Sequence, residues 1–292
     1  MLDCAKIVKQ TLEKFSEHDN PDINISIHLD ELNEGVRIIN YSWIKDDSIY
    51  YPASLIKLFA AFLTKFKIQQ NLKSFIKVRD PSDPEFGSRS TIDDLYDAVS
   101  ETLKHSDNDA LGFLVDFISD TTSGLRLFDG EYDSFKAKRT SIEQFFRSRS
   151  YTEFLRLRNK CFSFAPYGRD RQLIYEESDE VMSNRVSIND INKIMKDIKL
   201  NYPDLLPLMK RDFDDIEDEH IKFIAAGLSE FRDDISEFYS KAGWTSKVRH
   251  DAALIKTNSG DEFLFVIMTR GLSKHNDLIP EIAREIFRGI IS

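Results

Sequence analysis

The sequence contains little of what marks several large classes of protein. Its two cysteines, Cys4 and Cys161, are far apart and would pair only by an accident of the fold, so a reducing compartment is the simpler interpretation. The longest apolar runs, 58–63 and 263–268, are much shorter than the ~20 residues of a membrane-spanning helix. Residues 1–10 lack the apolar core and cleavage site of a signal peptide. We therefore expect no membrane partner, and a cytoplasmic protein, or a periplasmic or secreted one if an export segment was trimmed.

Excess positive charge and clustered metal ligands are also lacking. The formal net charge of −10 argues against a nucleic-acid partner, because a protein that binds the phosphate backbone needs a basic face. No group of His, Cys and Asp has the spacing of metal ligands and no glycine-rich phosphate loop occurs, so no cofactor is expected. Hydrophobic residues at 41% and charged residues at 31% are typical of a soluble globular chain, long enough for one large domain or two moderate ones.

What is present centres on residues 51–63, Tyr-Pro-Ala-Ser-Leu-Ile-Lys followed by an apolar run. The residues from Ser54 onward are mostly helix formers, so a helix is expected to begin at about Ser54. Residues three apart stack on one face of a helix, which brings the Ser54 hydroxyl to the Lys57 amine. A serine becomes a nucleophile when a neighbour takes its proton, and a lysine can take it when its amine is neutral. Burial by the apolar run and a second nearby cation would lower the lysine pKa by the roughly three units required.

The S-x-x-K pattern is not specific by itself. Ser42 and Ser74 also stand three residues before a lysine, and an N-cap serine followed by a surface lysine explains any of the three. Ser54 differs from the other two because it begins a predicted helix and is followed by partner motifs in a suitable order. The partner motifs therefore decide the interpretation.

Hydrophobic periodicity places strands at both ends of the chain and helices between them. Helical spacing of apolar residues predicts helices, whereas alternation of apolar and polar residues predicts strands, with a hairpin turn at Asn33-Glu34-Gly35. The predicted helices are 5–15, 92–104, 109–118, one opening at Ser187, and 278–291; the predicted strands are 23–29, 36–39, 251–256 and 262–269. Residues 130–185 show no clean periodicity, and 165–171 have the composition of a loop. The terminal segments are thus expected to form one sheet, with a helical domain inserted between them.

Three short motifs follow one another along the chain: Ser54-Leu55-Ile56-Lys57, Ser106-Asp107-Asn108 and Lys241-Ala242-Gly243. This order resembles the S-x-x-K, S-D-N and K-T-G set of class A β-lactamases and penicillin-binding proteins, and the surrounding helices and strands extend the resemblance to nearly the whole chain. The resemblance implies an α and β fold, in which a five-stranded antiparallel sheet is flanked by helices and carries an inserted all-helical domain. The sheet domain would comprise 1–57 and 215–292, and the helical domain 58–214.

The resemblance also implies a role for each motif residue. Ser54 would attack a strained or activated amide or ester carbonyl, with Lys57 as its base. Ser106 would pass the proton to the leaving nitrogen, and Asn108 would bind Lys57 or the substrate amide. Lys241 would be the second cation, lowering the pKa of Lys57 and attracting a substrate carboxylate.

Substrate binding would fall to the third motif and the strand after it. Gly243 belongs to that motif, and the backbone amides of Ser54 and Trp244 would form the oxyanion hole. Arg249 is either a bidentate anchor for the substrate carboxylate or a surface arginine at a strand end. Ala242 departs from the family, which usually has a threonine or serine there whose hydroxyl helps to hold the carboxylate. Loss of such a hydrogen bond would weaken binding by ~1.5–3 kcal/mol.

A second departure concerns the removal of the acyl group. Class A β-lactamases use a loop glutamate to activate the hydrolytic water, and Glu176, Glu177 and Glu180 are the candidates for this base in about the right region. Glu180 stands four residues before Asn184, as the family spacing asks. Solvated loop acids explain all three glutamates equally well, so the sequence does not place the deacylation base.

The sequence thus predicts a serine hydrolase that acts on β-lactam-type amides through an acyl-enzyme on Ser54. A slow-deacylating peptidase or esterase of the penicillin-binding type, and a non-catalytic descendant that binds a ligand in the old cleft, are the alternatives. The expected partner is a small-molecule or peptide-like substrate with a carboxylate, and we expect a monomer. His105 and His250 adjoin motif residues and are interpreted as structural hydrogen-bonding side chains.

Overall fold

The computed structural model describes residues 6, 10, 11, 13, 14, 22–30, 37–42, 49–70, 92–163, 165–175, 184–213, 223–271 and 274–291. The predicted turn at 33–35 lies outside this set, as does most of the predicted opening helix, whose described residues are all helical. No helix within the described residues is both long and apolar enough to cross a membrane.

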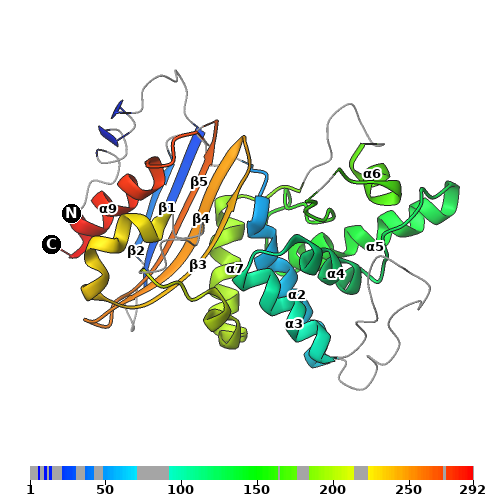
Figure 1. The fold of residues 1–292 in the computed structure, drawn as a ribbon, viewed down its shortest axis with the longest axis horizontal. Coiled ribbons are helices and arrows are strands. Elements are labelled where there is room, and N and C mark those ends of the chain that lie inside the picture. The colour runs from blue at the N-terminus through cyan, green and yellow to red at the C-terminus, as the bar shows by residue number, and fades with distance from the viewer. Residues whose placement is uncertain are drawn as a thin grey trace. The chain divides into compact units, whose positions relative to one another are not determined.

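The chain divides into two compact units, a sheet unit and a helical unit (Figure 1). The sheet unit contains Met1–Leu55, Val186–Lys199 and Met209–Ser292, and the helical unit contains Ile56–Arg185 and Leu200–Leu208.

The predicted domain boundaries, 1–57 and 215–292 for the sheet domain, differ from this division at one place above all. Most of helix α7 (Ile188–Asn201) belongs to the sheet unit instead of the helical one. Tyr50 and Val186 form an isolated antiparallel bridge, with both of its hydrogen bonds at 2.8–2.9 Å, and this bridge ties the start of α7 to the sheet unit. A bridge between residues so far apart in sequence leaves no local signal.

A five-stranded antiparallel sheet with the strand order β2-β1-β5-β4-β3 forms the centre of the sheet unit. The strands are β1 (Asp22–Asp30), β2 (Arg37–Ser42), β3 (Ile235–Trp244), β4 (Val248–Thr257) and β5 (Glu262–Arg270). The N-terminal pair of strands joins the C-terminal strands where β1 pairs with β5. The run from Phe263 to Thr269 in β5 is buried at every position, as in a strand that is covered on both faces.

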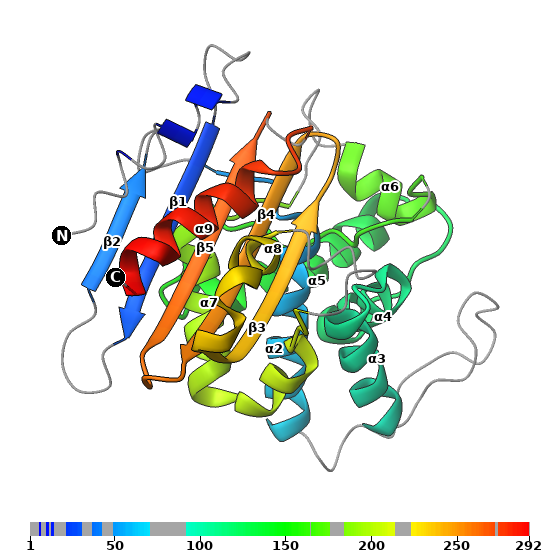
Figure 2. The ribbon, with the colours of Figure 1, turned by 60° about the vertical axis from the view of Figure 1, so that its left-hand side comes forward.

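Helices cover both faces of this sheet (Figures 1 and 2). Helices α8 (Ile224–Leu228) and α9 (Leu278–Ile291) lie over one face, with the 3₁₀ segment η4 (Ser229–Asp234) after α8, and α7 lies on the other side. Apolar residues recur every three or four positions along α9 and face the strands. The core between the strands and these helices includes Phe238, Ala253, Phe265, Ile282 and Phe287.

Helix α7 begins at a reciprocal cap. The Ser187 backbone N–H donates to Asp190 Oδ2 at 2.8 Å, and the Asp190 N–H donates to Ser187 Oγ at 3.2 Å. Two backbone donors that have no partner within the helix are thereby satisfied, which explains why the predicted start at Ser187 is correct.

The helical unit is arranged around one buried helix. It comprises α2 (Ile56–Gln70), α3 (Ile92–Lys104), α4 (Asn108–Ser119), α5 (Asp129–Arg147), α6 (Gly168–Tyr175) and most of the 3₁₀ segment η2 (Pro203–Met209). Every residue of α2 from Ile56 to Lys65 is buried, as expected of a helix surrounded by protein. Helices α3 and α4 pack against α2, and α5 packs against α4.

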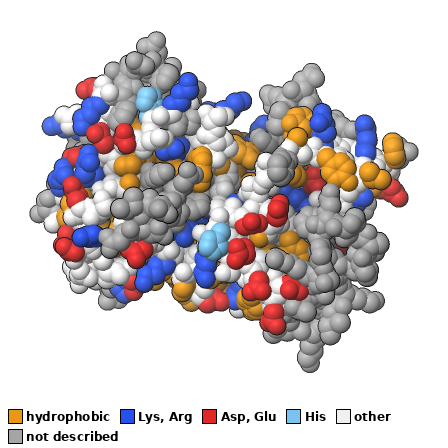
Figure 3. Space-filling view, in the orientation of Figure 1, with side chains coloured by type: hydrophobic (Ala, Val, Ile, Leu, Met, Phe, Trp, Pro, Cys, Tyr) orange, Lys and Arg blue, Asp and Glu red, His pale blue; other side chains and the backbone are white. Residues whose placement is uncertain are grey.

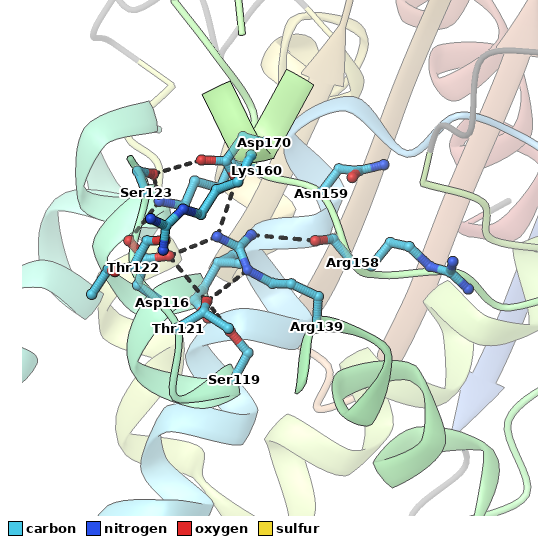
Figure 4. Close-up of polar contacts among 12 residues, drawn as sticks. Asp116, Ser119, Thr121, Thr122, Ser123, Arg139, Arg158, Asn159, Lys160 and Asp170 are labelled. Carbon is cyan, nitrogen blue, oxygen red and sulfur yellow. Dashed lines mark hydrogen bonds and ion pairs between the residues drawn. The ribbon is translucent and has the colours of Figure 1, made fainter. Parts of the chain in front are cut away.

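Helix α5 is absent from the prediction, because charged residues interrupt its buried face. Arg139 is fully buried in α5, and its guanidinium donates to Asp116 at 2.7 Å and to Asp170 at 3.0 Å (Figure 4). One turn later Glu143 is also buried and accepts from Arg158 at 2.6 Å. The buried charges interrupt the apolar positions Phe135, Ile142 and Phe146 on the same face, so the helical periodicity of the apolar residues is hidden.

The predicted loop at 165–171 is wrong at its C-terminal end, where α6 begins at Gly168. Gly168 has a φ of 52°, and a Cβ built there would lie 1.8 Å from the carbonyl oxygen of Gly124. Only glycine fits this approach of two backbone segments. The helix that follows buries Asp170 and Gln172, so polar residues again stand where a pattern search expects apolar ones.

Several other boundaries agree closely with the prediction. Helices α3 and α9 span the predicted 92–104 and 278–291, and α4 starts one residue earlier than predicted, at Asn108. Strands β4 and β5 contain the predicted strands and extend beyond them. Residues 241–243 lie inside β3, whereas no strand is predicted before position 241. Figure 3 shows basic and acidic side chains interspersed on the face of the molecule that it presents.

Candidate active site

The first cluster of motif residues lies within the helical unit. The Lys57 amine, in the first turn of α2, donates to Ser106 Oγ at 2.9 Å and to Asn108 Oδ1 at 2.8 Å. It also donates to the backbone carbonyl of Ser106. The first two predicted motifs therefore meet through their functional groups, and the Lys57 amine is placed to exchange a proton with the Ser106 hydroxyl.

Burial changes the acidity of this lysine. It lowers the pKa of Lys57 from 10.5 to about 8, whereas negative charge on Cys161 and Asp107 acts in the opposite direction. A pKa near 8 leaves roughly a tenth of the amine neutral at pH 7, so the group can act as a base. The sequence predicts a lowered pKa, but it assigns part of the effect to Lys241; desolvation is the cause within the helical unit.

The backbone at Ser106 is held in an uncommon conformation. Ser106 has a φ of 55°, in the left-handed region that costs energy for residues other than glycine and asparagine. The next residue, Asp107, caps α4 by accepting the Ala110 N–H at 2.6 Å. This turn carries the Ser106 hydroxyl and the Asn108 amide to the same side, where both meet Lys57.

The second cluster lies within the sheet unit, around Ser54. Ser54 is half-buried in the 3₁₀ segment η1 (Ala53–Leu55), which runs directly into α2, so the predicted helix start is correct to within two residues. Ala53 has a φ of 47°, a second strained residue beside a motif serine. Strain of this kind persists only where the surroundings enforce it.

Gly243 supplies part of that enforcement. A Cβ built on Gly243 would lie 2.8 Å from the Ser54 backbone nitrogen, 3.0 Å from the Leu55 nitrogen and 3.0 Å from the Pro52 oxygen. The β3 backbone therefore packs directly on the turn that carries Ser54, and the glycine of the third motif is needed for this contact.

We expect Gly243→Ala to lower the rate at which Ser54 is acylated by about 10-fold or more, because the added methyl must displace the backbone amide of Ser54. The rate is measured from the growth of the covalent adduct by intact-mass spectrometry. Gly130→Ala is the control, since Gly130 lies in α5 with nothing within 4 Å of an added Cβ. Equal rates for Gly243→Ala and wild type would show that the close packing has no role in acylation.

Lys241 and Ala242 both have buried side chains. The Lys241 amine is fully buried and donates to the Ala242 carbonyl at 3.1 Å. Ala242 packs its methyl group in the core cluster with Phe238 and Ala253. The predicted substrate contact at position 242 is thus limited to the backbone, since the side chain belongs to the core.

The comparisons with known proteins now identify the family. The model of the Beta-lactamase enzyme family matches residues 7–290, nearly the whole chain. The chain belongs to the beta-lactamase enzyme family. No curated protein matches the chain significantly in sequence.

Solved structures share the fold of this beta-lactamase family member. A class A beta-lactamase from Mycobacterium abscessus is 14% identical, with a TM-score of 0.64 and coverage of 99% of this chain and 100% of that one. A beta-lactamase from Sphaerobacter thermophilus is 15% identical, with a TM-score of 0.63 and coverage of 98% and 96%. PBP-A is 15% identical, with a TM-score of 0.60 and coverage of 98% and 96%. The α/β fold with an antiparallel sheet is therefore that of class A beta-lactamases.

In this family member, Trp244 and Arg249 both contact one aromatic ring. Trp244 is partly exposed, and its ring lies 5.7 Å from that of Phe223. The half-buried Arg249 guanidinium lies 4.8 Å from the same ring. Arg249 is thus half-buried against an aromatic ring, unlike an arginine that is fully exposed on the surface.

His250 is a structural residue, as the sequence predicts. It is fully buried, its Nε2–H donates to the Tyr51 carbonyl at 2.9 Å, and its Nδ1 accepts the Thr269 N–H at 3.2 Å. Burial lowers the pKa of His250 to about 4, so the ring is neutral. Sequence reasoning did not foresee that His250 ties β4 to the segment before Ser54. His105 lies exposed in the turn after α3.

The deacylation base remains a prediction. Glu176, Glu177 and Glu180 lie outside the described residues. Asn184, the residue used to align them, is buried and forms two hydrogen bonds with the backbone of Asn159, at 2.9 and 2.8 Å. Among the described residues, no three His, Cys, Asp or Glu side chains are grouped so that they could hold a metal ion.

A buried carboxyl next to His250 adds a titrating group to the sheet. Asp251 is fully buried and accepts the Ile224 N–H at 3.0 Å. Burial raises the pKa of Asp251 to about 7, although the backbone amides of Ile224 and Ala252 and the charges of Lys241 and Arg211 act against it. The folded state therefore holds this proton more tightly than the unfolded chain does.

His250 and Asp251 have opposite effects on how the stability of the fold depends on pH. The raised pKa of Asp251 stabilises the fold below about pH 4, and this contribution is lost as the pH rises to about 7. The lowered pKa of His250 stabilises the fold above about pH 6.5, and this contribution is lost as the pH falls to about 4. Between these limits the two effects largely cancel.

We expect Asp251→Asn to remove the contribution of Asp251 to the pH dependence of stability, so that the opposite contribution of His250 becomes measurable. Relative to wild type, the free energy of unfolding of the variant should rise by about 3 kcal/mol between pH 5 and pH 8, because asparagine does not titrate. Urea titrations across this range measure the difference. A constant offset between the two proteins would show that Asp251 is ionised throughout.

Proposed function

We propose that this protein is a serine hydrolase that opens β-lactam-type amides through an acyl-enzyme on Ser54. The observation that carries the proposal is the buried Lys57 amine, which is bonded to Ser106 Oγ and Asn108 Oδ1 and stands three residues after Ser54 in one continuous helical run. A lysine whose pKa is near 8 can take the proton of a serine, and a second serine on the same amine can pass it onward.

The proposed reaction uses the residues of both clusters. Ser54 Oγ attacks the carbonyl carbon as Lys57 takes its proton, and the Ser54 and Trp244 amides stabilise the oxyanion. The C–N bond then breaks, and the proton passes through Ser106 to the leaving nitrogen. Lys241 and Arg249 attract the substrate carboxylate, and Asn108 holds Lys57 in place.

The structural neighbours support acyl-enzyme chemistry. A leucine-to-glutamate variant of PBP-A, with 15% identity and a TM-score of 0.61 to this chain, was solved as an acyl-enzyme complex with penicillin G. The structural similarity to beta-lactamases also supports a β-lactam as the class of substrate proposed for this chain.

Covalent labelling tests the proposal. Incubation with a penicillin or a fluorophosphonate, followed by intact-mass analysis, should give one adduct on wild type and none on Ser54→Ala. Ser42→Ala is a matched control, because Ser42 also stands three residues before a lysine but is the last residue of strand β2. No adduct on wild type, or one that persists on Ser54→Ala, would refute the proposal.

A slow-deacylating penicillin-binding activity is the second candidate. The observation that favours it is the structural similarity to PBP-A, a variant of which was solved as an acyl-enzyme complex with penicillin G. A burst of nitrocefin hydrolysis without steady turnover would support this candidate over a fast beta-lactamase.

A further inference from the structure

Helix α8 of the sheet unit is fixed near both of its ends. At its start, the Ile224 backbone N–H donates at 3.0 Å to the carboxyl group of Asp251, a fully buried residue of β4. Near its end, Gly227 lies so close to α9 that an added Cβ would stand 2.1 Å from the Pro280 carbonyl oxygen. Phe223, the residue that precedes α8, is therefore held at a defined place against the sheet.

The face of the sheet that α8 covers also carries Trp244 and Arg249. Trp244 is the last residue of β3 and pairs directly with Arg249 of β4, so both side chains leave the sheet on one face. Ala242 and Asp251 form the pair two positions further along the strands, which places them on this same face. Ala242 belongs to the core cluster that includes residues of α8, and Asp251 binds the start of that helix.

The Phe223 ring contacts both members of the Trp244–Arg249 pair. Its centroid lies 5.7 Å from that of the Trp244 ring and 4.8 Å from the central carbon of the Arg249 guanidinium, which stands over it. Phe223 is 2% exposed and Trp244 is 37% exposed, with Arg249 half-buried, so the cluster reaches from the core to the surface. An aromatic ring attracts a cation through its face. The N–H donors of a guanidinium point outward in its own plane, where they can bind a carboxylate in a bidentate way.

We propose that Phe223 is a positioning residue, which holds the Arg249 guanidinium for the substrate carboxylate and makes the site select acids over their neutral esters. The inference rests on the proposed function of Ser54, and every residue that it uses lies in the sheet unit with Ser54. Gly243, which precedes Trp244, packs on the Ser54 backbone and so ties this end of β3 to the serine. Phe223 lies outside the three motifs, and nothing in the sequence around it indicates this role.

Two substrates that differ in charge test the inference. Penicillin G carries a carboxylate, whereas its methyl ester is neutral, and intact-mass spectrometry measures the rate at which each acylates the protein. We expect the acid to acylate wild type about 10-fold or more faster than the ester. Phe223→Leu removes the ring and keeps an apolar side chain, so it should slow the acid about 10-fold and the ester by less than about 3-fold.

Phe263→Leu is the matched control. Phe263 is also buried in the core of the sheet unit, where its ring packs against that of Phe287. We expect this variant to keep the wild-type ratio of the two rates, because its ring has no part in holding Arg249. If Phe223→Leu does not fold, Phe223→Met supplies the same comparison, since methionine is a flexible apolar side chain without a ring.

A double variant asks whether Phe223 acts through Arg249. Arg249→Gln removes the guanidinium, so adding Phe223→Leu to it should change the rate with the acid by less than about 3-fold. A purely structural effect of Phe223→Leu would lower the rate by the same factor with or without Arg249.

The outcomes separate the two proposals. If neither substrate forms an adduct with wild type, the proposed function fails. If wild type forms adducts but Phe223→Leu slows acid and ester equally, or is equally harmful in the Arg249→Gln background, the inference at Phe223 is wrong and the proposed function stands. Equal rates of wild type with acid and ester would also contradict the inference, because the site would then not recognise the carboxylate.

Discussion

Replacing Lys57 by methionine is expected to slow the acylation of Ser54 at pH 7 by about 10³-fold, the effect of losing a general base. Methionine preserves most of the aliphatic length of the lysine, so the packing of α2 is largely retained. The loss comes from the amine, which donates to Ser106 Oγ and Asn108 Oδ1. The measurement is the rate of adduct formation with penicillin or nitrocefin.

Lys67→Met is the matched control for this variant. Lys67 lies in the last turn of the same helix, and its amine donates to the Ile118 carbonyl at 2.6 Å, away from Ser106. We expect its acylation rate to stay within about 3-fold of wild type. Comparable losses in both variants would assign the effect to the stability of α2 and remove the role of Lys57 as a base.

The second large effect concerns stability. We expect Arg139→Met to lower the free energy of unfolding by about 3–5 kcal/mol, because it leaves buried carboxylates without their cation. Arg139 has no exposed surface and binds both Asp116 and Asp170, whose side chains are 7% and 5% exposed. Lys160 also forms an ion pair with Asp116. Urea denaturation measures the change.

Lys138→Met serves as the control for the Arg139 variant. Lys138 precedes Arg139 on α5 and pairs with Asp120 at 2.8 Å, but both side chains are largely exposed. An exposed ion pair contributes little, so the change should stay within about 0.5 kcal/mol. A loss below about 1 kcal/mol for Arg139→Met would mean that the network is not needed for the fold.

Local signals in the sequence were sufficient for the elements that carry the motifs. Apolar alternation in β4 and β5, the apolar stripe of α9 and the Ser187 cap of α7 are each encoded within a few residues. The meeting of the first two motifs at Lys57 was predicted as well, because the order of the motifs resembles that of a family. Hydrophobic periodicity alone does not predict that these two distant motifs lie close together, whereas the family resemblance does.

Long-range pairing of charged residues is what the sequence could not reveal. Helices α5 and α6 turn Arg139 and Asp170 inward, and each is acceptable in the core only because the other is there. In a sequence each looks like a surface residue. The oppositely charged partner that stabilises each buried side chain is known only once the fold is known.

The dependence of the acylation rate of Ser54 on pH tests the central claim most directly. If the neutral Lys57 amine takes the proton of Ser54, the rate should rise about tenfold per pH unit below pH 8 and level off above it, since the pKa of Lys57 is about 8. Rapid-quench intact-mass measurements from pH 6 to pH 9.5 give this profile. A rate that is independent of pH across this range, with the adduct on Ser54, would contradict the account.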